Sequence, residues 1–338
     1  MDCTGTAFCL GNDRPEELLP RAVRLGFRFF WAITVGLGVL GVVSSTAGQE
    51  QPLRTSMEAL SRRTAPGNTQ AGRIRVSVNV VLVPALVTDT YDRPVLGLQK
   101  DAFRLYEDGV EQDITHFFRQ DRPMSVGILF DASGSMARKM DQSRGAISKF
   151  LGLSMPGDEF FLFKFADRPE QLCAFKKDAQ EIVAKMTQLR PSGWTALFDA
   201  IYLGMHRMKR AHNDRKALLI LSDGGDNNSR YSEQEVRTMV QEGDVRIFAI
   251  SIQDRSPALE KLANESGGRA FRIQKLEDLE DAAAKVSEQL HSEYVLGYVP
   301  KAQVRDGMYR KLKVETVTGV TGSLLHTSWR HGYYGPAE

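Results

Sequence analysis

The sequence has few cysteines and no cysteine–histidine metal motif. Only 3 of the 338 residues are Cys; Cys3 and Cys9 lie in the first ten residues, which leaves Cys173 alone in the rest of the chain. Three cysteines exclude a disulfide-rich scaffold, and the lack of a CxxC pair or a Cys/His cluster argues against a structural zinc site. We expect Cys173 to act as a small buried hydrophobic residue rather than as a reactive thiol.

A strong charge of either sign is also missing. The chain has 44 Lys and Arg against 42 Asp and Glu, a formal net charge of +2. It therefore lacks the basic field of a dedicated nucleic-acid binder, and we expect no nucleic-acid partner. Beyond residue 47, the phosphate-binding patterns GxxxxGK[ST] and GxGxxG are absent, as is the GxSxG motif of α/β hydrolases, so nucleotide binding and serine-hydrolase chemistry have no support there.

A single long apolar run lies near the N-terminus. Residues 29–43, FFWAITVGLGVLGVV, carry no charge, follow three arginines at 21–28 and precede four small residues. A positive flank, a short apolar segment and a small-residue exit are typical of a secretory signal peptide. As a helix the run spans ~22 Å, less than the ~30 Å hydrocarbon core, which favours a cleaved leader over residues 1–47 rather than an uncleaved anchor. We expect an exported protein, periplasmic or secreted, that contacts a membrane only if this leader is retained.

The composition then changes from a polar linker to β-rich sequence. Residues 48–72 are polar and contain Pro and Gly, as linkers do. Segments 73–120 and 293–335 are rich in β-branched and aromatic residues, and the Asp108-Gly109 pair between two alternating runs predicts a hairpin. We expect the two segments to pair into one β-rich domain, although two separate β units fit the sequence as well.

Strands and helices alternate over residues 124–290. The apolar runs SVGILFD, KALLILSDG and RIFAISI are typical of buried parallel strands. Helical periodicity appears between the strands, at 139–151, 178–189, 195–211, 232–242, 256–266 and 276–290. This alternation predicts an α/β fold, with a doubly wound and mainly parallel sheet covered by helices on both faces.

Five oxygen-bearing side chains follow strands or loops of this segment. Asp131, Ser133 and Ser135 come directly after the first apolar strand, Thr195 opens a helix, and Asp223 ends another strand. Because the carboxyl ends of parallel strands meet at one edge of a sheet, we expect these side chains to lie close together. Carboxylates and hydroxyls without sulfur or imidazole favour a hard cation, Mg²⁺ first, with Mn²⁺ or Ca²⁺ as alternatives.

A simpler interpretation exists for each motif taken alone. Asp131 and Ser133 could cap the following helix, because Asp and Ser accept hydrogen bonds from free N–H groups. Asp223-Gly224 could form a turn after its strand. The occurrence of all five oxygen donors on one alternating α/β frame favours the metal site.

The DxSxS loop, the distant Thr and the later Asp resemble the metal-ion-dependent adhesion site of von Willebrand factor type A domains. The resemblance covers 124–290, and the sequences FRLYEDGVEQDITHF and RHGYYG also resemble exported bacterial proteins called VWFA-related. It implies that Ser133 and Ser135 coordinate the metal directly. It further implies that Asp131 and Asp223 act largely through water, and that Thr195 coordinates when a ligand is bound.

This resemblance implies recognition without catalysis. A Mg²⁺ ion with neutral direct ligands stays electrophilic, so that an Asp or Glu of a partner protein completes its coordination shell. We therefore expect a metal-dependent protein-binding module and no enzyme. Two alternatives remain: a Mg²⁺-dependent hydrolase, which needs a general base that the sequence does not offer beyond the metal-site carboxylates, and a structural envelope protein whose site has lapsed.

Overall fold

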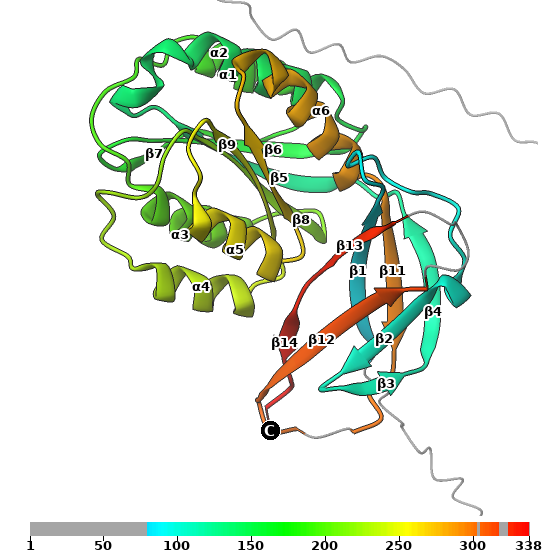
Figure 1. Cartoon of the computed structure of the whole chain (residues 1–338). Coiled ribbons are helices and arrows are strands. Elements are labelled where there is room, and N and C mark those ends of the chain that lie inside the picture. Colours follow the sequence, from blue (N-terminus) through cyan, green and yellow to red (C-terminus); the bar gives the residue numbers. More distant parts are fainter. Residues whose placement is uncertain (1–79, 303–304, 318–323, 338) are drawn as a thin grey trace, which may run out of the picture. The chain divides into compact units, whose positions relative to one another are not determined.

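The computed structural model of the chain describes residues 80–302, 305–317 and 324–337 (Figure 1). The predicted leader at 1–47 and the linker at 48–72 lie outside the described residues. Within the described part, no helix is both long enough and apolar enough to cross a membrane.

The centre of the chain forms a six-stranded sheet with the order β10-β9-β8-β5-β6-β7. Its strands are β5 (Met124–Asp131), β6 (Glu159–Phe165), β7 (Pro169–Lys176), β8 (Arg215–Ser222), β9 (Arg246–Ile252) and β10 (Arg269–Ile273). All neighbours run parallel except the edge strand β7, which pairs antiparallel with β6. The predicted doubly wound, mainly parallel sheet is confirmed.

Helices cover both faces of this sheet (Figure 1). They are η2 (Gly134–Arg138), α1 (Met140–Gly152), α2 (Ala179–Met186), α3 (Leu197–Met208), α4 (Glu233–Glu242), α5 (Pro257–Glu265), η3 (Leu276–Asp278) and α6 (Leu279–Leu290). Helices α1, α2 and α6 lie on one face and α3, α4 and α5 on the other. The start of α4 follows from its sequence, since Ser232 and Glu235 form a capping box.

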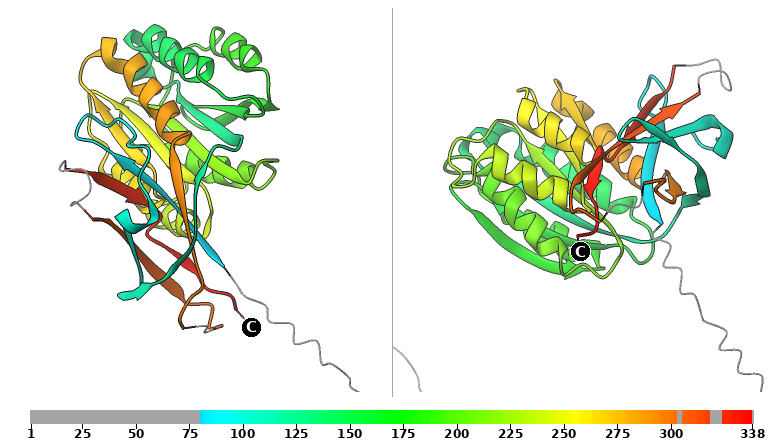
Figure 2. Two further views of the ribbon diagram at one scale, coloured as in Figure 1. Left: turned by 90° about the vertical axis from the view of Figure 1, so that its right-hand side faces the viewer. Right: turned by 90° about the horizontal axis from the view of Figure 1, so that it is seen from below.

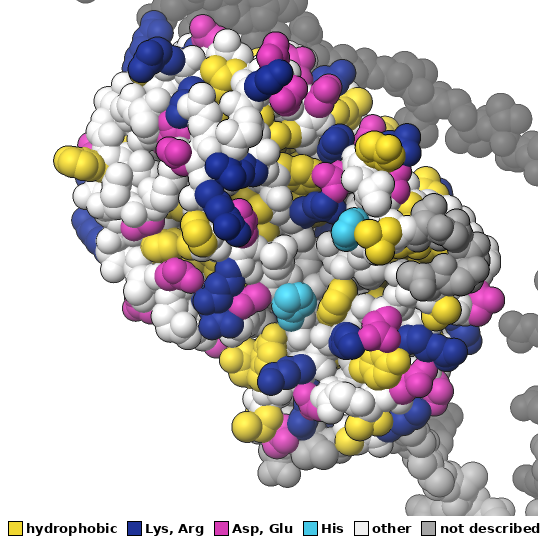
Figure 3. All heavy atoms as spheres, viewed as in Figure 1, with side chains coloured by type: hydrophobic (Ala, Val, Ile, Leu, Met, Phe, Trp, Pro, Cys, Tyr) yellow, Lys and Arg dark blue, Asp and Glu magenta, His cyan; other side chains and the backbone are white. Residues whose placement is uncertain are grey.

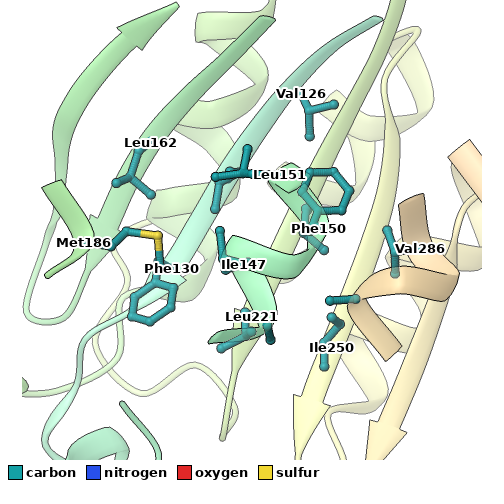
Figure 4. Close-up of a cluster of buried hydrophobic side chains, with 14 of the residues drawn as sticks. Val126, Phe130, Ile147, Phe150, Leu151, Leu162, Met186, Leu221, Ile250 and Val286 are labelled. Atoms are coloured by element: carbon teal, nitrogen blue, oxygen red, sulfur yellow. The ribbon is translucent and has the colours of Figure 1, made fainter. Parts of the chain in front are cut away.

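A hydrophobic layer joins α1 and α6 to the sheet. Phe130 of β5 and Ile250 of β9 pack with Ile147 and Phe150 of α1 and Val286 of α6 (Figure 4). Each of these side chains is at most 2% exposed. Because both faces of the sheet are covered, every residue of β5 is buried, which explains its continuous apolar run. This packing fixes the loops that leave the carboxyl ends of the strands.

The segments on either side of the α/β part form two four-stranded antiparallel sheets, ordered β13-β1-β11-β4 and β14-β12-β2-β3. Their elements are β1 (Val81–Thr88), η1 (Lys100–Ala102), β2 (Phe103–Glu107), β3 (Val110–Gln112), β4 (Ile114–Gln120), β11 (Glu293–Tyr298), β12 (Tyr309–Thr316), β13 (His326–Trp329) and β14 (Gly332–Tyr334). Each sheet combines strands from both segments, as with β1 and β11 (Figure 2). The limits of the individual domains stay a prediction.

The predicted Asp108-Gly109 hairpin connects β2 and β3. Both turn residues have positive φ, 48° and 83°, as a type I′ turn requires. The chain enters the central sheet at Met124, the start of β5, and leaves it through α6 into β11. The antiparallel sheets are therefore connected to the amino end of β5, whereas Asp131 lies at the carboxyl end of that strand.

Candidate metal centre

Asp131 is a fully buried carboxylate at the end of β5. Its Oδ1 accepts the N–H of Ser133 at 2.8 Å, and its Oδ2 accepts the hydroxyl of Ser222 at 2.5 Å. Burial raises the pKa of Asp131; hydrogen bonds from Ser133 and Ser222 lower it in part, and the negative charge of Asp223 raises it further. The two hydrogen bonds orient this carboxylate toward the loop that follows β5.

A chain of side-chain contacts links that loop to Asp223 at the end of β8. The hydroxyls of Ser133 and Ser135 lie 3.1 Å apart, and Ser135 Oγ donates to Asp223 Oδ1 at 2.7 Å. Ser133 occupies the N-cap position of η2, but its side chain makes no capping hydrogen bond. The simple capping interpretation is therefore wrong for Ser133, because its hydroxyl faces Ser135 instead.

The other oxygen of Asp223 contacts a cation. Lys139 Nζ, from the residue preceding α1, donates to Asp223 Oδ2 at 2.7 Å. The two side chains are only 14% and 1% exposed. An ion pair with so little contact with water is screened much less than a surface pair.

Thr195 lies on a third loop that is tied to the other two. The N–H of Gly134 donates to the carbonyl of Gly193 at 3.0 Å, which joins this loop to the one after β5. On the other side, the N–H of Thr195 donates to Asn227 Oδ1 at 2.7 Å, and its carbonyl accepts the N–H of Asn227 at 3.0 Å. The structure thus holds Thr195, itself buried, between the loops that carry the other four residues.

Gly193 is required by the geometry of the Thr195 loop. Its φ is +79°, and a Cβ there would lie 2.5 Å from both carboxylate oxygens of Asp167. Asp167 Oδ1 accepts the N–H of Trp194 at 2.8 Å, which fixes the turn before Thr195. The Trp194 side chain is 64% exposed, which places a large aromatic surface one residue from Thr195.

Four contributors to this arrangement are absent from the sequence analysis: Lys139, Trp194, Ser222 and Asn227. Ser222 and Asn227 flank Asp223 in sequence, but nothing local shows that they hold Asp131 and Thr195. Lys139 follows the last Ser of the DxSxS motif by four residues, a closeness in sequence that could have pointed to it.

The donor set fits a hard divalent cation. Within the described residues there is no group of three or more His, Cys, Asp or Glu side chains suited to a metal. Here instead two buried carboxylates, Asp131 and Asp223, accompany three hydroxyls, and the ammonium of Lys139 contacts Asp223. Carboxylate and hydroxyl oxygens suit Mg²⁺, Mn²⁺ or Ca²⁺ better than softer metals.

Part of this chain is similar in sequence to known proteins. The family model described as von Willebrand factor type A domain matches residues 126–225. The inter-alpha-trypsin inhibitor heavy chain H4 is 29% identical in Sus scrofa over 189 residues, 50% of this chain and 20% of that protein. The Homo sapiens protein is 28% identical over 227 residues, 60% and 24% respectively. The matched part thus spans only a fifth to a quarter of the length of these relatives.

Two solved structures match part of this chain. The von Willebrand factor type A protein from Catenulispora acidiphila covers 71% of this chain and 76% of its own, with a TM-score of 0.47 and 13% identity. Proximal thread matrix protein 1 from the mussel byssus, in a form with a zinc-occupied MIDAS motif, covers 54% and 49%, with a TM-score of 0.45 and 18% identity.

The family match encloses all five candidate positions, from Asp131 to Asp223. It also coincides with the parallel strands whose carboxyl ends carry them. The chain therefore contains a von Willebrand factor type A domain.

Proposed function

We propose that this chain is an exported protein-binding module that holds Mg²⁺ at the carboxyl edge of its central sheet and captures an Asp or Glu side chain of a partner protein. The observation that carries the proposal is the contact from Ser135 to Asp223, continued to Ser133, which joins oxygen donors from β5 and β8. A bound divalent ion supplies a Lewis-acidic position that a partner carboxylate fills.

Each of the five residues has a role in this proposal. Ser133 and Ser135 are direct ligands through their hydroxyls, and Thr195 joins them when the partner binds. Asp131 and Asp223 hold metal-bound waters, which leaves the ion with mostly neutral direct ligands. The hydrogen bonds that Asp131 accepts from Ser133 and Ser222 support this role, because an orienting carboxylate must itself be fixed.

The rim of the site is suited to contact with a protein. Gly134 and Ser135 are exposed, so the loop that carries the Ser135 hydroxyl is open to a partner protein. Trp194 adds an exposed aromatic ring, the residue type most enriched among strong contributors to protein interfaces. Basic and acidic side chains are mixed over the face of the molecule in Figure 3, which agrees with a protein partner rather than a nucleic acid.

Binding is favoured over catalysis by the surroundings of the carboxylates. A hydrolytic mechanism needs a general base within hydrogen-bond reach of the attacking water. Among the described residues, no histidine is hydrogen-bonded to the five candidate residues.

Isothermal titration of the full chain with MgCl₂ and MnCl₂ tests the metal site. Asp131→Ala should abolish binding of the metal, whereas Thr195→Ala should spare most of the metal affinity and lose Mg²⁺-dependent capture of partner. Thr187→Ala, at an exposed threonine after α2, is the matched control and should change neither. Unaltered metal binding by Asp131→Ala contradicts the site, and partner capture that persists in EDTA contradicts the metal-dependent mode.

A further inference from the structure

A cavity lies at the opposite edge of the central sheet from the candidate metal centre. It has a volume of about 350 Å³ and lies where the first residues of β8 and β9, Arg215 and Arg246, face the antiparallel strands. Since β8 has eight residues, its two ends are ~23 Å apart. This cavity is therefore separate from the candidate metal centre at the other end of the strand.

Positive charge exceeds negative charge in the lining of this cavity. The basic residues are Arg122, Arg215, Lys216, Arg246 and Arg330, and the acidic residues are Asp214, Asp244 and Glu293. Arg330 pairs with Asp244 at 3.5 Å, while Arg215 and Arg246 both pair with Glu293. No ion pair is found for Arg122 or Lys216 within the described residues. The lining thus carries an excess of two positive charges.

Two of these guanidinium groups are buried while sharing a single carboxylate. Arg215 and Arg246 are 6% and 9% exposed. Burial, followed by the charge of Arg215, lowers the pKa of Arg246 to about 9, and burial also lowers the pKa of Arg215. Within the described part of the chain, Arg215 Nε and Arg330 Nε have no hydrogen-bond partner. Buried charged groups normally have all of their hydrogen bonds satisfied, so the guanidinium groups of Arg215 and Arg330 favour the binding of an additional anion.

Besides the neutral polar residues Gln120 and Ser266, the lining has an apolar wall. Leu82 and Phe118 border the cavity and are 55% and 44% exposed, and Pro84 and Val295 complete this wall. An exposed apolar wall beside buried arginines suits a ligand with one charged end and one hydrophobic end. The volume lies within the range of small-molecule sites.

We propose that this cavity binds a small organic oxyanion, whose phosphate or carboxylate head contacts Arg215 and Arg246 and whose apolar part lies against Leu82 and Phe118. Arginine suits this role because its planar fork of N–H donors matches carboxylate and phosphate oxygens in a bidentate manner. The anion adds the negative charge that Glu293 alone does not supply to two guanidinium groups. This site goes beyond the proposed metal-dependent function and does not depend on it.

Thermal unfolding of the full chain tests the proposal, because a ligand that binds only the folded state raises the unfolding temperature. The probes are sodium phosphate and hexyl phosphate, each compared with sodium chloride at equal ionic strength to match the screening of surface charges. We expect both phosphates to raise the unfolding temperature and chloride to have no such effect. Titration calorimetry should show tighter binding of hexyl phosphate; equal affinities contradict the apolar part of the site.

Variants locate the effect. Arg246→Gln should weaken binding of hexyl phosphate at least tenfold, with circular dichroism to check its fold. Lys216→Gln changes a partly buried residue without an ion pair and should weaken binding about threefold, so the proposal stays testable if the first variant fails to fold. Arg255→Gln removes an exposed arginine paired with Glu260 outside the cavity and should bind as the parent does. Equal stabilisation of all three variants, or equal stabilisation by chloride, overturns the proposal.

Discussion

Replacement of Lys139 by Met should raise the affinity of the candidate centre for Mg²⁺. In the structure Lys139 Nζ donates to Asp223 Oδ2 at 2.7 Å, with both side chains largely shielded from water. A divalent ion that recruits Asp223 must first break this contact. Hydrogen bonds to charged groups contribute about 1.5–3 kcal/mol, and each 1.4 kcal/mol is a factor of about ten in affinity. Lys139→Met should therefore tighten Mg²⁺ binding by about 10- to 100-fold.

The same substitution should destabilise the metal-free protein. Without Lys139, the buried carboxylate of Asp223 keeps the hydrogen bond from Ser135 but loses its cationic partner. Loss of one partner of a buried polar group lowers the free energy of unfolding by about 1–3 kcal/mol, and by more when the group left behind is charged. We expect this loss in urea unfolding curves recorded in EDTA, and its recovery in saturating Mg²⁺, because the ion then supplies the positive charge.

Titration calorimetry with MgCl₂ measures the first effect, and paired urea unfolding curves measure the second. Lys149→Met is the matched control, since Lys149 is an exposed lysine on α1 and its removal should change neither quantity. An affinity for Mg²⁺ that is unchanged or weaker in Lys139→Met refutes the reasoning. That result would mean that Lys139 helps to assemble the metal site rather than competing with the ion.

Three further predictions concern the rim, the loops and the base of the α/β part. Trp194→Ala should keep the Mg²⁺ affinity but weaken Mg²⁺-dependent binding of acidic peptides by about 30-fold. This factor corresponds to the loss of about 2 kcal/mol at an interface tryptophan. Peptide binding equal to that of the parent in calorimetry contradicts the prediction. Gly193→Ala should lower the free energy of unfolding, measured in urea, by at least ~1 kcal/mol, because the φ of Gly193 is positive and Asp167 occupies the space that the new Cβ needs. The control Gly152→Ala should not be destabilising, because the space around Gly152 is open. Asp158 is buried, which alone raises its pKa, but hydrogen bonds from His291 and two backbone N–H groups leave that pKa below its usual 3.8. The contribution of Asp158 to stability is therefore present above about pH 4 and lost as the pH falls through the lowered pKa. In urea unfolding, Asp158→Asn should lose less stability than the parent between pH 5 and pH 3. Equal losses would show that Asp158 does not cause the acid destabilisation.

Much of the fold could be predicted because its signals are local. The eight residues of β5 are all buried, and a strand covered on both faces must be apolar throughout. The Asp108-Gly109 pair specifies its turn because these residues tolerate the positive φ values found there. Neither observation needs knowledge of distant residues, and the confirmed mainly parallel sheet follows from the repetition of such local patterns.

The partners of the polar groups could not be predicted in the same way. The sequence identifies Asp131 and Asp223 as oxygen donors at strand ends, but the contact of Asp223 with Lys139 joins residues 84 positions apart. It exists because β5 and β8 are neighbours in the sheet, and no periodicity in the sequence specifies that neighbour. The role of Ser222 in holding Asp131 has the same origin.

By itself, the sequence determined the alternation of strands and helices and the kinds of oxygen donor that follow the strands, because both depend on residues close together in the chain. The tertiary structure alone decided which charged side chains share a site. Arg215, Arg246 and Glu293 carry no common motif, yet they meet. Strands β8 and β9 begin at the same edge of the central sheet, and the first residue of β11, in a separate sheet, lies against that edge. Long-range electrostatic contacts depend on strand order, and strand order is fixed by the packing of the whole unit rather than by any one segment.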